Sequence, residues 1–176
     1  MEPSLLARIS DEGCVSLIGM AGAGKSTLAS LLARRLGWAW LDTDRLIEAT
    51  AGASLSALLA RLGLEGFLRL EEDVVAGLCV KRCVVATGGS VIYGPRAVSR
   101  LKACGPLVFL SIDLETFLRR VGDPGQRAFV VPSGLTLPDV FAERQPLYAA
   151  AADLTVTSCG VSPEACADQI LEGIAS

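Results

Sequence analysis

The sequence contains no histidine, and this absence excludes several common kinds of active site. Nucleophile systems that pair serine or cysteine with histidine cannot form. The six cysteines include no Cys-x-x-Cys pair, so the usual spacing of zinc ligands is also missing. Two of them, Cys14 and Cys83, fall in apolar segments and are interpreted as small buried hydrophobic residues. Any catalysis must therefore rest on carboxylates, basic side chains, backbone groups and a metal ion.

The sequence also lacks an excess of positive charge and any long apolar run. Its net charge is −3, and no cluster of lysine and arginine suggests a surface for nucleic acid. The longest segment without charge, residues 83–95, contains a Gly-Gly pair and is too short to span a bilayer. The N-terminal residues lack the basic-then-apolar order of a signal peptide. We expect a cytoplasmic monomer that binds neither nucleic acid nor membrane.

Residues 19–27 carry the strongest local signal in the chain. They have the spacing G-x-x-x-x-G-K-S/T, directly after the apolar run 14–18 and before a helical pattern over 27–36. Glycines let successive backbone N–H groups approach a polyphosphate at a helix N-terminus. Lys25 would reach the β- and γ-phosphates of ATP, and the hydroxyl of Ser26 would bind Mg²⁺. The predicted ATP contacts in this loop are Gly22, Ala23, Gly24, Lys25, Ser26 and Thr27.

Short apolar segments alternate with helical patterns along the rest of the chain. Strands are expected at 14–18, 38–41, 83–87, 107–112 and 154–157, with helices between and after them. Apolar strands that are buried on both faces and separated by helices indicate an α/β fold with a doubly wound, five-stranded parallel sheet. With 176 residues and 51% hydrophobic content, the whole chain, 1–176, is expected to form a single domain.

Polar residues follow two of these strands, at the edge where ligands bind to parallel α/β sheets. Asp42 and Asp44 follow the second strand, and Gly88-Gly89-Ser90 follows the third. Two carboxylates beside a phosphate loop favour a functional role over a solvated turn. Residues 122–138 fit no regular period and contain Arg127. We interpret this segment as a mobile lid over the transferring phosphoryl group; a plain surface loop is the alternative.

The order of several motifs resembles the shikimate kinase family. The resemblance runs over residues 15–174 and rests on GxxGxGKST, Leu-Asp-Thr-Asp, Phe-x-x-x-Glu-Glu-Asp-Val-Val, Thr-Gly-Gly, an Arg-Arg pair before the lid, and Glu-Arg-Gln-Pro-Leu-Tyr. It implies a P-loop kinase fold. It also implies transfer of the γ-phosphoryl group of ATP, with Mg²⁺, to a hydroxyl of a small carboxylate, which in the family is the 3-hydroxyl of shikimate. The rate of such a reaction comes mainly from positioning and from neutralising charge on the phosphoryl oxygens.

The resemblance also implies roles for individual residues. Asp44 would hold the acceptor hydroxyl and take its proton, and Asp42 would steady Mg²⁺ through a bound water. Arg127 is similar to the lid arginine that meets the γ-phosphate, and Arg144 to the arginine that grips the substrate carboxylate. Arg120 is similar to the arginine that stacks on adenine, and Pro163 falls near the adenine loop. Gly88 and Gly89 match the glycines that face the substrate.

Two positions depart from the family pattern. The family carries an arginine that shares the shikimate carboxylate where this chain has Leu68, and a third glycine where it has Ser90. Arg69 lies one residue further on, about 100° around a helix, and cannot replace that arginine without a shift in geometry. A pocket with one positive charge fewer tolerates the ammonium group of an α-amino acid. A hydroxy amino acid such as homoserine is therefore an alternative acceptor.

Two further alternatives remain open. A non-catalytic nucleotide-binding protein would keep the phosphate loop. It would need none of the four residues Asp42, Asp44, Arg127 and Arg144. ATP hydrolysis that no small hydroxy acid stimulates would favour this alternative. A nucleoside-monophosphate kinase is disfavoured by Asp44 and Arg144, which suit a small acid better than a base.

Overall fold

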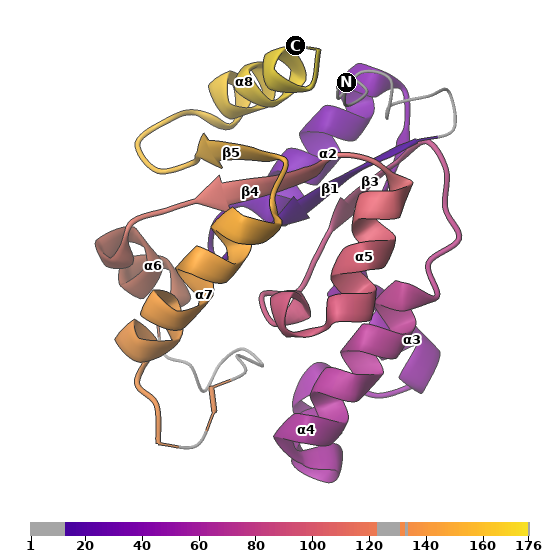
Figure 1. Cartoon of the computed structure of the whole chain (residues 1–176), viewed down its shortest axis with the longest axis vertical. Helices are drawn as coiled ribbons and strands as arrows, with labels where there is room; N and C mark the ends of the chain where they lie inside the picture. The colour runs from indigo at the N-terminus through magenta and orange to yellow at the C-terminus, as the bar shows by residue number, and fades with distance from the viewer. Residues whose placement is uncertain (1–12, 123–130, 133, 176) are drawn as a thin grey trace.

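The computed structural model describes residues 13–122, 131–132 and 134–175. Five parallel strands form one sheet in the order β2-β3-β1-β4-β5 (Figure 1). Their bounds are β1 Cys14–Ile18, β2 Ala39–Asp42, β3 Cys83–Ala86, β4 Leu107–Ser111 and β5 Leu154–Thr157. The predicted five-stranded parallel sheet is confirmed, and each strand end lies within one residue of its expected position.

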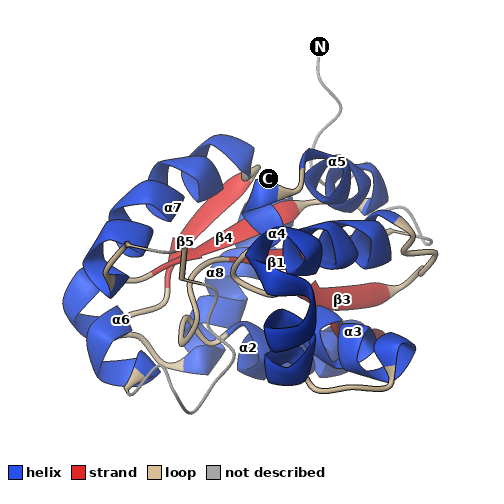
Figure 2. Ribbon diagram, turned by 90° about the horizontal axis from the view of Figure 1, so that it is seen from below, coloured by secondary structure: helices blue, strands red, loops and turns tan. Residues whose placement is uncertain are grey.

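Helices connect the strands and lie on both sides of the sheet (Figure 2). In chain order they are α2 Lys25–Leu36, α3 Thr43–Ala51, α4 Leu55–Ala76, the 3₁₀ helix η1 Val91–Tyr93, α5 Pro95–Cys104, α6 Leu114–Val121, α7 Leu137–Ala151 and α8 Pro163–Ala175. Helix α2 packs against β1, β2 and β3, and α8 packs against β5. Helix α5 packs against β1, and α7 packs against β4. The result is the doubly wound architecture that the strand-helix alternation predicts.

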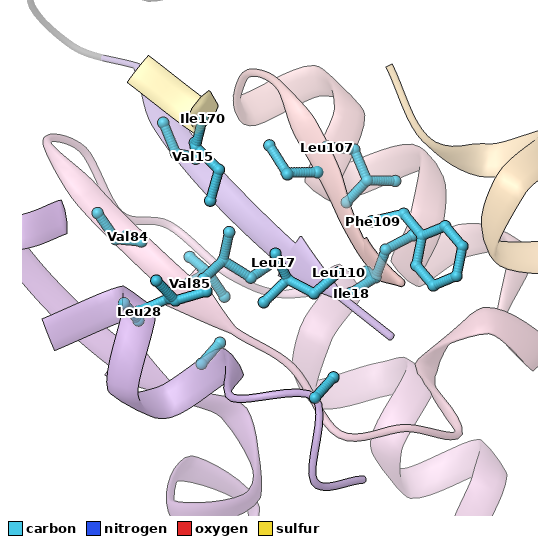
Figure 3. Close-up of a cluster of buried hydrophobic side chains, with 14 of the residues drawn as sticks. Val15, Leu17, Ile18, Leu28, Val84, Val85, Leu107, Phe109, Leu110 and Ile170 are labelled. Atoms are coloured by element: carbon cyan, nitrogen blue, oxygen red, sulfur yellow. The ribbon is translucent and has the colours of Figure 1, made fainter. Parts of the chain in front are cut away.

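The main hydrophobic core surrounds the central strand of the sheet. Two strands lie on each side of β1, and β1 is buried along its whole length. Figure 3 shows its side chains, among them Val15 and Leu17, together with side chains of β3, β4 and α2. A second, smaller cluster of Ile47, Leu58 and Phe67 joins α3 to α4. Helix α4 is therefore held to α3 by this cluster and to the main core through Val75.

Two glycines interrupt the helical stretch after β2. Helix α3 ends at Gly52, which has a φ of 64°. Gly63 interrupts α4 with a φ of 68° and a ψ of 178°. Glycine adopts these positive φ values without the penalty that a side chain would add. Within the described residues no single helix is long and apolar enough to cross a bilayer, and α3 and α4 have the required length and composition only when taken together as a pair bent by 91°.

The predicted lid, residues 122–138, falls largely outside the described part of the chain. Residues 123–130 and 133 are not described, and Arg127 is among them. Helix α7 begins at Leu137, and Thr136 is its N-cap in a capping box with Asp139. The C-terminal end of the segment is therefore the start of a well-capped helix. The closing motion of a lid stays a prediction.

Gly105 leaves the least room for a side chain among the glycines next to the sheet. Its φ is +151°, and a Cβ atom at this position would lie 2.0 Å from the carbonyl oxygen of Cys14. We expect Gly105→Ala to lower the free energy of unfolding by about 3 kcal/mol or more, because the backbone of β1 must move. Urea unfolding measures this loss.

Gly160→Ala is the matched control for this steric effect. Gly160 also has a positive φ, +71°, but nothing lies within 4 Å of its Cβ position. Its substitution should cost only the conformational penalty of about 1–2 kcal/mol. Equal losses of stability in the two variants would contradict the steric explanation for Gly105.

Candidate active site

One cavity of about 800 Å³ lies at the carboxyl ends of β1, β2 and β3. Ligands bind at this edge of open parallel sheets because the loops that follow the strands meet there. Most of the predicted site residues line the cavity: Gly22, Gly24, Lys25, Ser26, Thr27, Asp42, Asp44, Gly88, Gly89, Ser90, Arg120 and Arg144. The fold thus brings together residues that are up to 122 positions apart, from Gly22 to Arg144.

Lys25, the first residue of α2, closes the phosphate loop. Its Nζ donates hydrogen bonds to the carbonyl oxygens of Gly19 and Met20, both at 2.7 Å. Burial lowers the pKa of Lys25 to about 8, although the nearby carboxylates of Asp44 and Asp42 act to raise it. The loop therefore combines a buried ammonium group with the N-terminus of a helix, and both attract the phosphates of a nucleotide.

Two side chains hold the phosphate loop from outside. The Nη1 atom of Arg120, in α6, donates to the carbonyl oxygen of Gly22 at 2.8 Å. The Oγ atom of Ser158, just after β5, donates to the carbonyl oxygen of Ala23 at 2.9 Å. Ala23 is buried, and its N–H donates to the carbonyl oxygen of Met20 at 3.2 Å. Ala23 thus shapes the loop from within, and its contact with ATP stays a prediction.

Asp42 connects the phosphate loop to the opposite side of the cavity. Its Oδ2 accepts a hydrogen bond from Oγ of Ser26 at 2.8 Å. Its Oδ1 accepts the N–H groups of Asp44 and Arg45 at 3.0 and 3.3 Å, and so caps α3. The two residues predicted to hold Mg²⁺ are therefore neighbours, and their oxygens are the hard ligands that this ion prefers.

The ligand set around Ser26 and Asp42 suits an ion that shares its coordination with a substrate. Among the residues described here, no group of three or more histidine, cysteine and acidic side chains could hold a metal ion. Mg²⁺ is commonly bound by one or two protein oxygens together with substrate phosphates and water. The residues present therefore fit Mg²⁺ that arrives with a nucleotide.

Asp44 lies in the first turn of α3, in the wall of the cavity. Burial raises its pKa to about 6, and the neighbouring Asp42 adds to this shift while Lys25 opposes it. Its Oδ1 lies 2.6 Å from the point that a Cβ atom on Gly88 would occupy. A carboxylate with this pKa is mostly ionised at neutral pH and can accept a hydrogen bond from a hydroxyl group that enters over Gly88.

Arg144 projects from α7 into the cavity wall and is only 1% exposed. Its Nε donates to the hydroxyl of Tyr93 at 3.1 Å, and its guanidinium lies 5.0 Å from the centroid of the Tyr93 ring. Its Nη1 lies 3.4 Å from the Cβ position of Gly89. The hydroxyl of Tyr148, one turn further along α7, donates to the carbonyl oxygen of Gly89. These contacts hold the guanidinium beside the glycine turn, Gly88-Gly89, where it can bind a carboxylate.

Glu71, the first glutamate of the Phe-x-x-x-Glu-Glu motif, was given no role from the sequence and is a carboxylate buried beside the cavity. It lies in α4, four residues after Phe67 and four before Val75, and both of these residues are buried. Glu71 is 2% exposed, and its Oε1 has no hydrogen-bond partner among the described residues. Burial raises its pKa to about 7, and a hydrogen bond with the side chain of Ser90 opposes this shift. An acidic residue on the apolar stripe of a helix is the sequence signal that could have identified it.

Tyr93 and Ser158 were also not predicted. Both act through hydrogen bonds to distant parts of the chain, Tyr93 to Arg144 and Ser158 to Ala23. No local motif marks such contacts, because each joins segments that are far apart in the sequence.

A few predicted residues lie away from the cavity wall. Leu68 packs against the second hydrophobic cluster and is not one of the lining residues. Arg69 forms an exposed ion pair with Glu65 at 2.5 Å, so it does not replace the arginine that the family has at position 68. Pro163 is the exposed first residue of α8 and does not line the cavity. Arg127 lies outside the described residues.

The fold and the cavity together define a class of protein. A phosphate loop, a hydrogen-bonded serine-aspartate pair, and a buried carboxylate and guanidinium around one cavity characterise a small-molecule kinase of the P-loop type. The family model described as shikimate kinase matches residues 21–175. The chain belongs to the shikimate kinase family and is a shikimate kinase-like, ATP-dependent alcohol phosphotransferase.

Individual relatives and solved structures agree with this assignment. The shikimate kinase of Gloeobacter violaceus is 39% identical over 91% of each chain. That of Synechococcus sp. strain RCC307 is 38% identical over 89% of this chain and 81% of the relative. The structure of shikimate kinase from Acinetobacter baumannii in complex with shikimate has a TM-score of 0.84 at 30% identity and covers 97% of both chains. The likeness extends over the whole fold and includes the cavity-lining elements.

The buried carboxylate of Glu71 predicts a pH-dependent stability. Its pKa of about 7 in the folded state lies above the ordinary value of 4.5. Between these values the folded state binds more protons than the unfolded state, so its stability falls as the pH rises from 4.5 through 7. Glu71→Gln has no such titration. It should raise the free energy of unfolding by up to roughly 3 kcal/mol at pH 8 and change it little at pH 4.

Urea unfolding of the wild type and Glu71→Gln at the two pH values measures this difference. A stabilisation of the same size at pH 4 and pH 8 would show that the substitution acts through packing, and would contradict the electrostatic account.

Proposed function

We propose that this chain transfers the γ-phosphoryl group of ATP to a hydroxyl of a small carboxylate. The observation that carries the proposal is that Lys25, Asp44 and Arg144, from three different helices, line one cavity. The reaction needs a cation for the phosphates, a carboxylate for the acceptor hydroxyl and a cation for the acceptor carboxylate. Relatives named shikimate kinase, at 38–39% identity, support the same reaction.

On the nucleotide side, Lys25 and the N–H groups of the loop bind the β- and γ-phosphates. Lys25 exchanges the carbonyl oxygens of Gly19 and Met20 for phosphate oxygens, so its ammonium group stays hydrogen-bonded. Ser26 and Asp42, which share a hydrogen bond, would hold Mg²⁺. When bound, the ion would supply positive charge that offsets the charge of the phosphates.

Three further roles on the nucleotide side rest on the family resemblance. Arg120 stacks on the adenine ring, and its hydrogen bond to Gly22 ties α6 to the phosphate loop. Pro163 lies near the adenine at the start of α8. Arg127 meets the γ-phosphate and adds a second positive charge to that of Lys25.

On the acceptor side, Asp44 orients the hydroxyl and takes its proton. A weak base suffices, because in a loose transition state the hydroxyl loses its proton late. Arg144 binds the acceptor carboxylate. Since Tyr93 accepts the Nε–H of Arg144, the Nη side of the guanidinium is directed toward Gly89. Shikimate is the first acceptor to test, because the relatives are named for it.

A hydroxy amino acid such as homoserine is a second candidate acceptor, and the surroundings of Leu68 favour it. Leu68 packs in an apolar cluster, and Arg69 is paired with Glu65 away from the cavity. Among the described residues that line the cavity, Arg144 is the one buried arginine. A single buried guanidinium repels an ammonium group less than two would.

An assay of ADP release, with ATP and Mg²⁺, tests the proposal on shikimate and L-homoserine in parallel. We expect ADP release that depends on an acceptor. Lys25→Ala should lower the rate by at least about 10²–10³-fold, because charge on the transferring oxygens is no longer neutralised. Lys81→Ala, an exposed lysine that does not line the cavity, is the control. ADP release that neither acceptor stimulates would contradict transfer to these acceptors and would favour the alternative of a nucleotide-binding protein without an acceptor site.

Leu68→Arg tests whether the missing guanidinium sets the choice of acceptor. We expect the KM for shikimate to fall by about tenfold or more and the KM for homoserine to rise, because the added charge attracts a carboxylate and repels an ammonium. Arg69→Ala is the control and should change neither KM, since Arg69 is exposed. Thermal unfolding checks that the Leu68 variant is folded. An unchanged shikimate KM in the folded variant would refute this account.

A further inference from the structure

The chain contains two tyrosines, and the hydroxyls of both are hydrogen-bonded to the guanidinium of Arg144. Tyr93, in η1, accepts the Nε–H group at 3.1 Å. Its ring centroid lies 5.0 Å from Cζ of Arg144, within the range of a cation–π contact. Tyr148, in α7, bonds to the same guanidinium and donates its own proton to the carbonyl oxygen of Gly89. A long, buried side chain is thus held by two aromatic residues.

The hydroxyl of Tyr93 makes two hydrogen bonds, and both of its partners are charged. Arginine is a donor only, so the oxygen of Tyr93 accepts from Nε of Arg144. The hydroxyl proton then serves the second bond, to the side chain of Glu143, the residue before Arg144 in α7. Hydrogen bonds with a charged partner are stronger than those between neutral groups. The Tyr93 hydroxyl therefore ties η1 firmly to α7.

Helix η1 starts directly after the glycine turn in the cavity wall. The N–H group of Tyr93 donates to the carbonyl oxygen of Ser90 at 2.9 Å, and Ser90 lines the cavity. Tyr148 makes the reverse connection, because its hydroxyl reaches from α7 to the carbonyl oxygen of Gly89. The two tyrosines therefore join α7 to the residues 88–93 at two points, and both points involve Arg144.

The bond from Tyr93 decides which edge of the guanidinium meets an acceptor. A guanidinium offers a carboxylate two neighbouring N–H groups, either Nε with one Nη or the two Nη groups together. Tyr93 occupies the Nε–H group, so the first of these edges is used within the protein. Nη1 lies 3.4 Å from the Cβ position of Gly89, which places the Nη edge at the glycine turn. A side chain that is already held in this direction need not be ordered when the acceptor binds.

We propose that Tyr93 is a positioning residue for the acceptor: its hydroxyl and ring hold the guanidinium of Arg144 in the direction that binds the acceptor carboxylate. This role rests on the proposed function of Arg144 and adds the residue that sets its direction. Tyr93 is not one of the residues that line the cavity, so it acts through Arg144 and does not touch the acceptor.

Tyr93→Phe tests this role, because it removes the hydroxyl and keeps the ring. We expect the KM for a carboxylate acceptor, shikimate or L-homoserine, to rise by about tenfold, since the guanidinium loses a hydrogen bond that fixes its direction. The kcat and the KM for ATP should stay within about twofold of the wild type, because the phosphate loop and Asp44 keep their contacts.

The amides of the two acceptors separate the positioning of Arg144 from a general structural effect. Shikimamide and L-homoserine amide carry an uncharged group of nearly the same shape in place of the carboxylate, so their binding gains little from a guanidinium. Tyr93→Phe should lower kcat/KM for the carboxylate and leave kcat/KM for its amide unchanged. Equal losses on the carboxylate and the amide would overturn the role of Tyr93, and so would the absence of any loss on the carboxylate.

Ile92→Val is the matched control. It also removes one non-hydrogen atom from η1, at the neighbouring residue, which packs against the main core. It should leave the KM for the acceptor unchanged. A rise as large as that of Tyr93→Phe would show that any disturbance of η1 has this effect, and would overturn the specific role of Tyr93. Thermal unfolding checks that both variants are folded.

Calorimetric binding of shikimate and of L-homoserine, in the presence of a non-hydrolysable ATP analogue, separates this inference from the proposed function. Binding that Tyr93→Phe weakens by about tenfold, without turnover of either acceptor, would uphold the role of Tyr93 and overturn the proposed kinase reaction. Turnover with a KM for the acceptor that Tyr93→Phe leaves unchanged would uphold the kinase and overturn the role of Tyr93. Neither binding nor turnover of the two acceptors would overturn both.

Discussion

The carboxylate of Asp42 holds the two halves of the cavity together. One of its oxygens accepts the hydroxyl of Ser26 at the start of α2, and the other caps α3, the helix that carries Asp44. The register of β2 against β3 sets Asp42 opposite Ala86, from which the chain runs on to Gly88. The phosphate loop, the helix that carries Asp44 and the strand end before Gly88 are therefore linked through one hydrogen-bonded carboxylate at the end of an edge strand.

Burial makes the charges around the cavity act strongly on one another. The pKa of Lys25 is lowered to about 8, and the pKa values of Asp44 and Glu71 are raised to about 6 and 7. Removal from water is the largest cause in each case, and opposite charges across the cavity offset part of it. A charged ligand stabilises such groups because it replaces the hydration that they lost on burial. Burial disfavours the charged forms in the free protein, and for the same reason it favours the binding of phosphates, carboxylates and ammonium groups.

The sheet and the phosphate loop could be predicted because each depends on a local pattern. Strand β1, for example, is an apolar run. The contacts of Tyr93 and Glu71 could not be predicted in this way. They depend on how η1, α4 and α7 pack, and packing is settled by contacts between residues far apart in the chain.

The sequence by itself determined the class of fold and the phosphate-binding loop, because the spacing of Gly24, Lys25 and Ser26 after an apolar run suffices to specify such a loop. The reaction type followed from the resemblance of the motif order to the shikimate kinase family. The sequence also identified Leu68 as a departure from the family. Only the tertiary structure decided that Leu68 belongs to an apolar cluster and that Glu71 lies behind Gly88 with an unused oxygen. The reason is physical: whether a side chain on α4 meets solvent, a hydrophobic neighbour or the cavity depends on how that helix packs, and one helix alone does not contain this information.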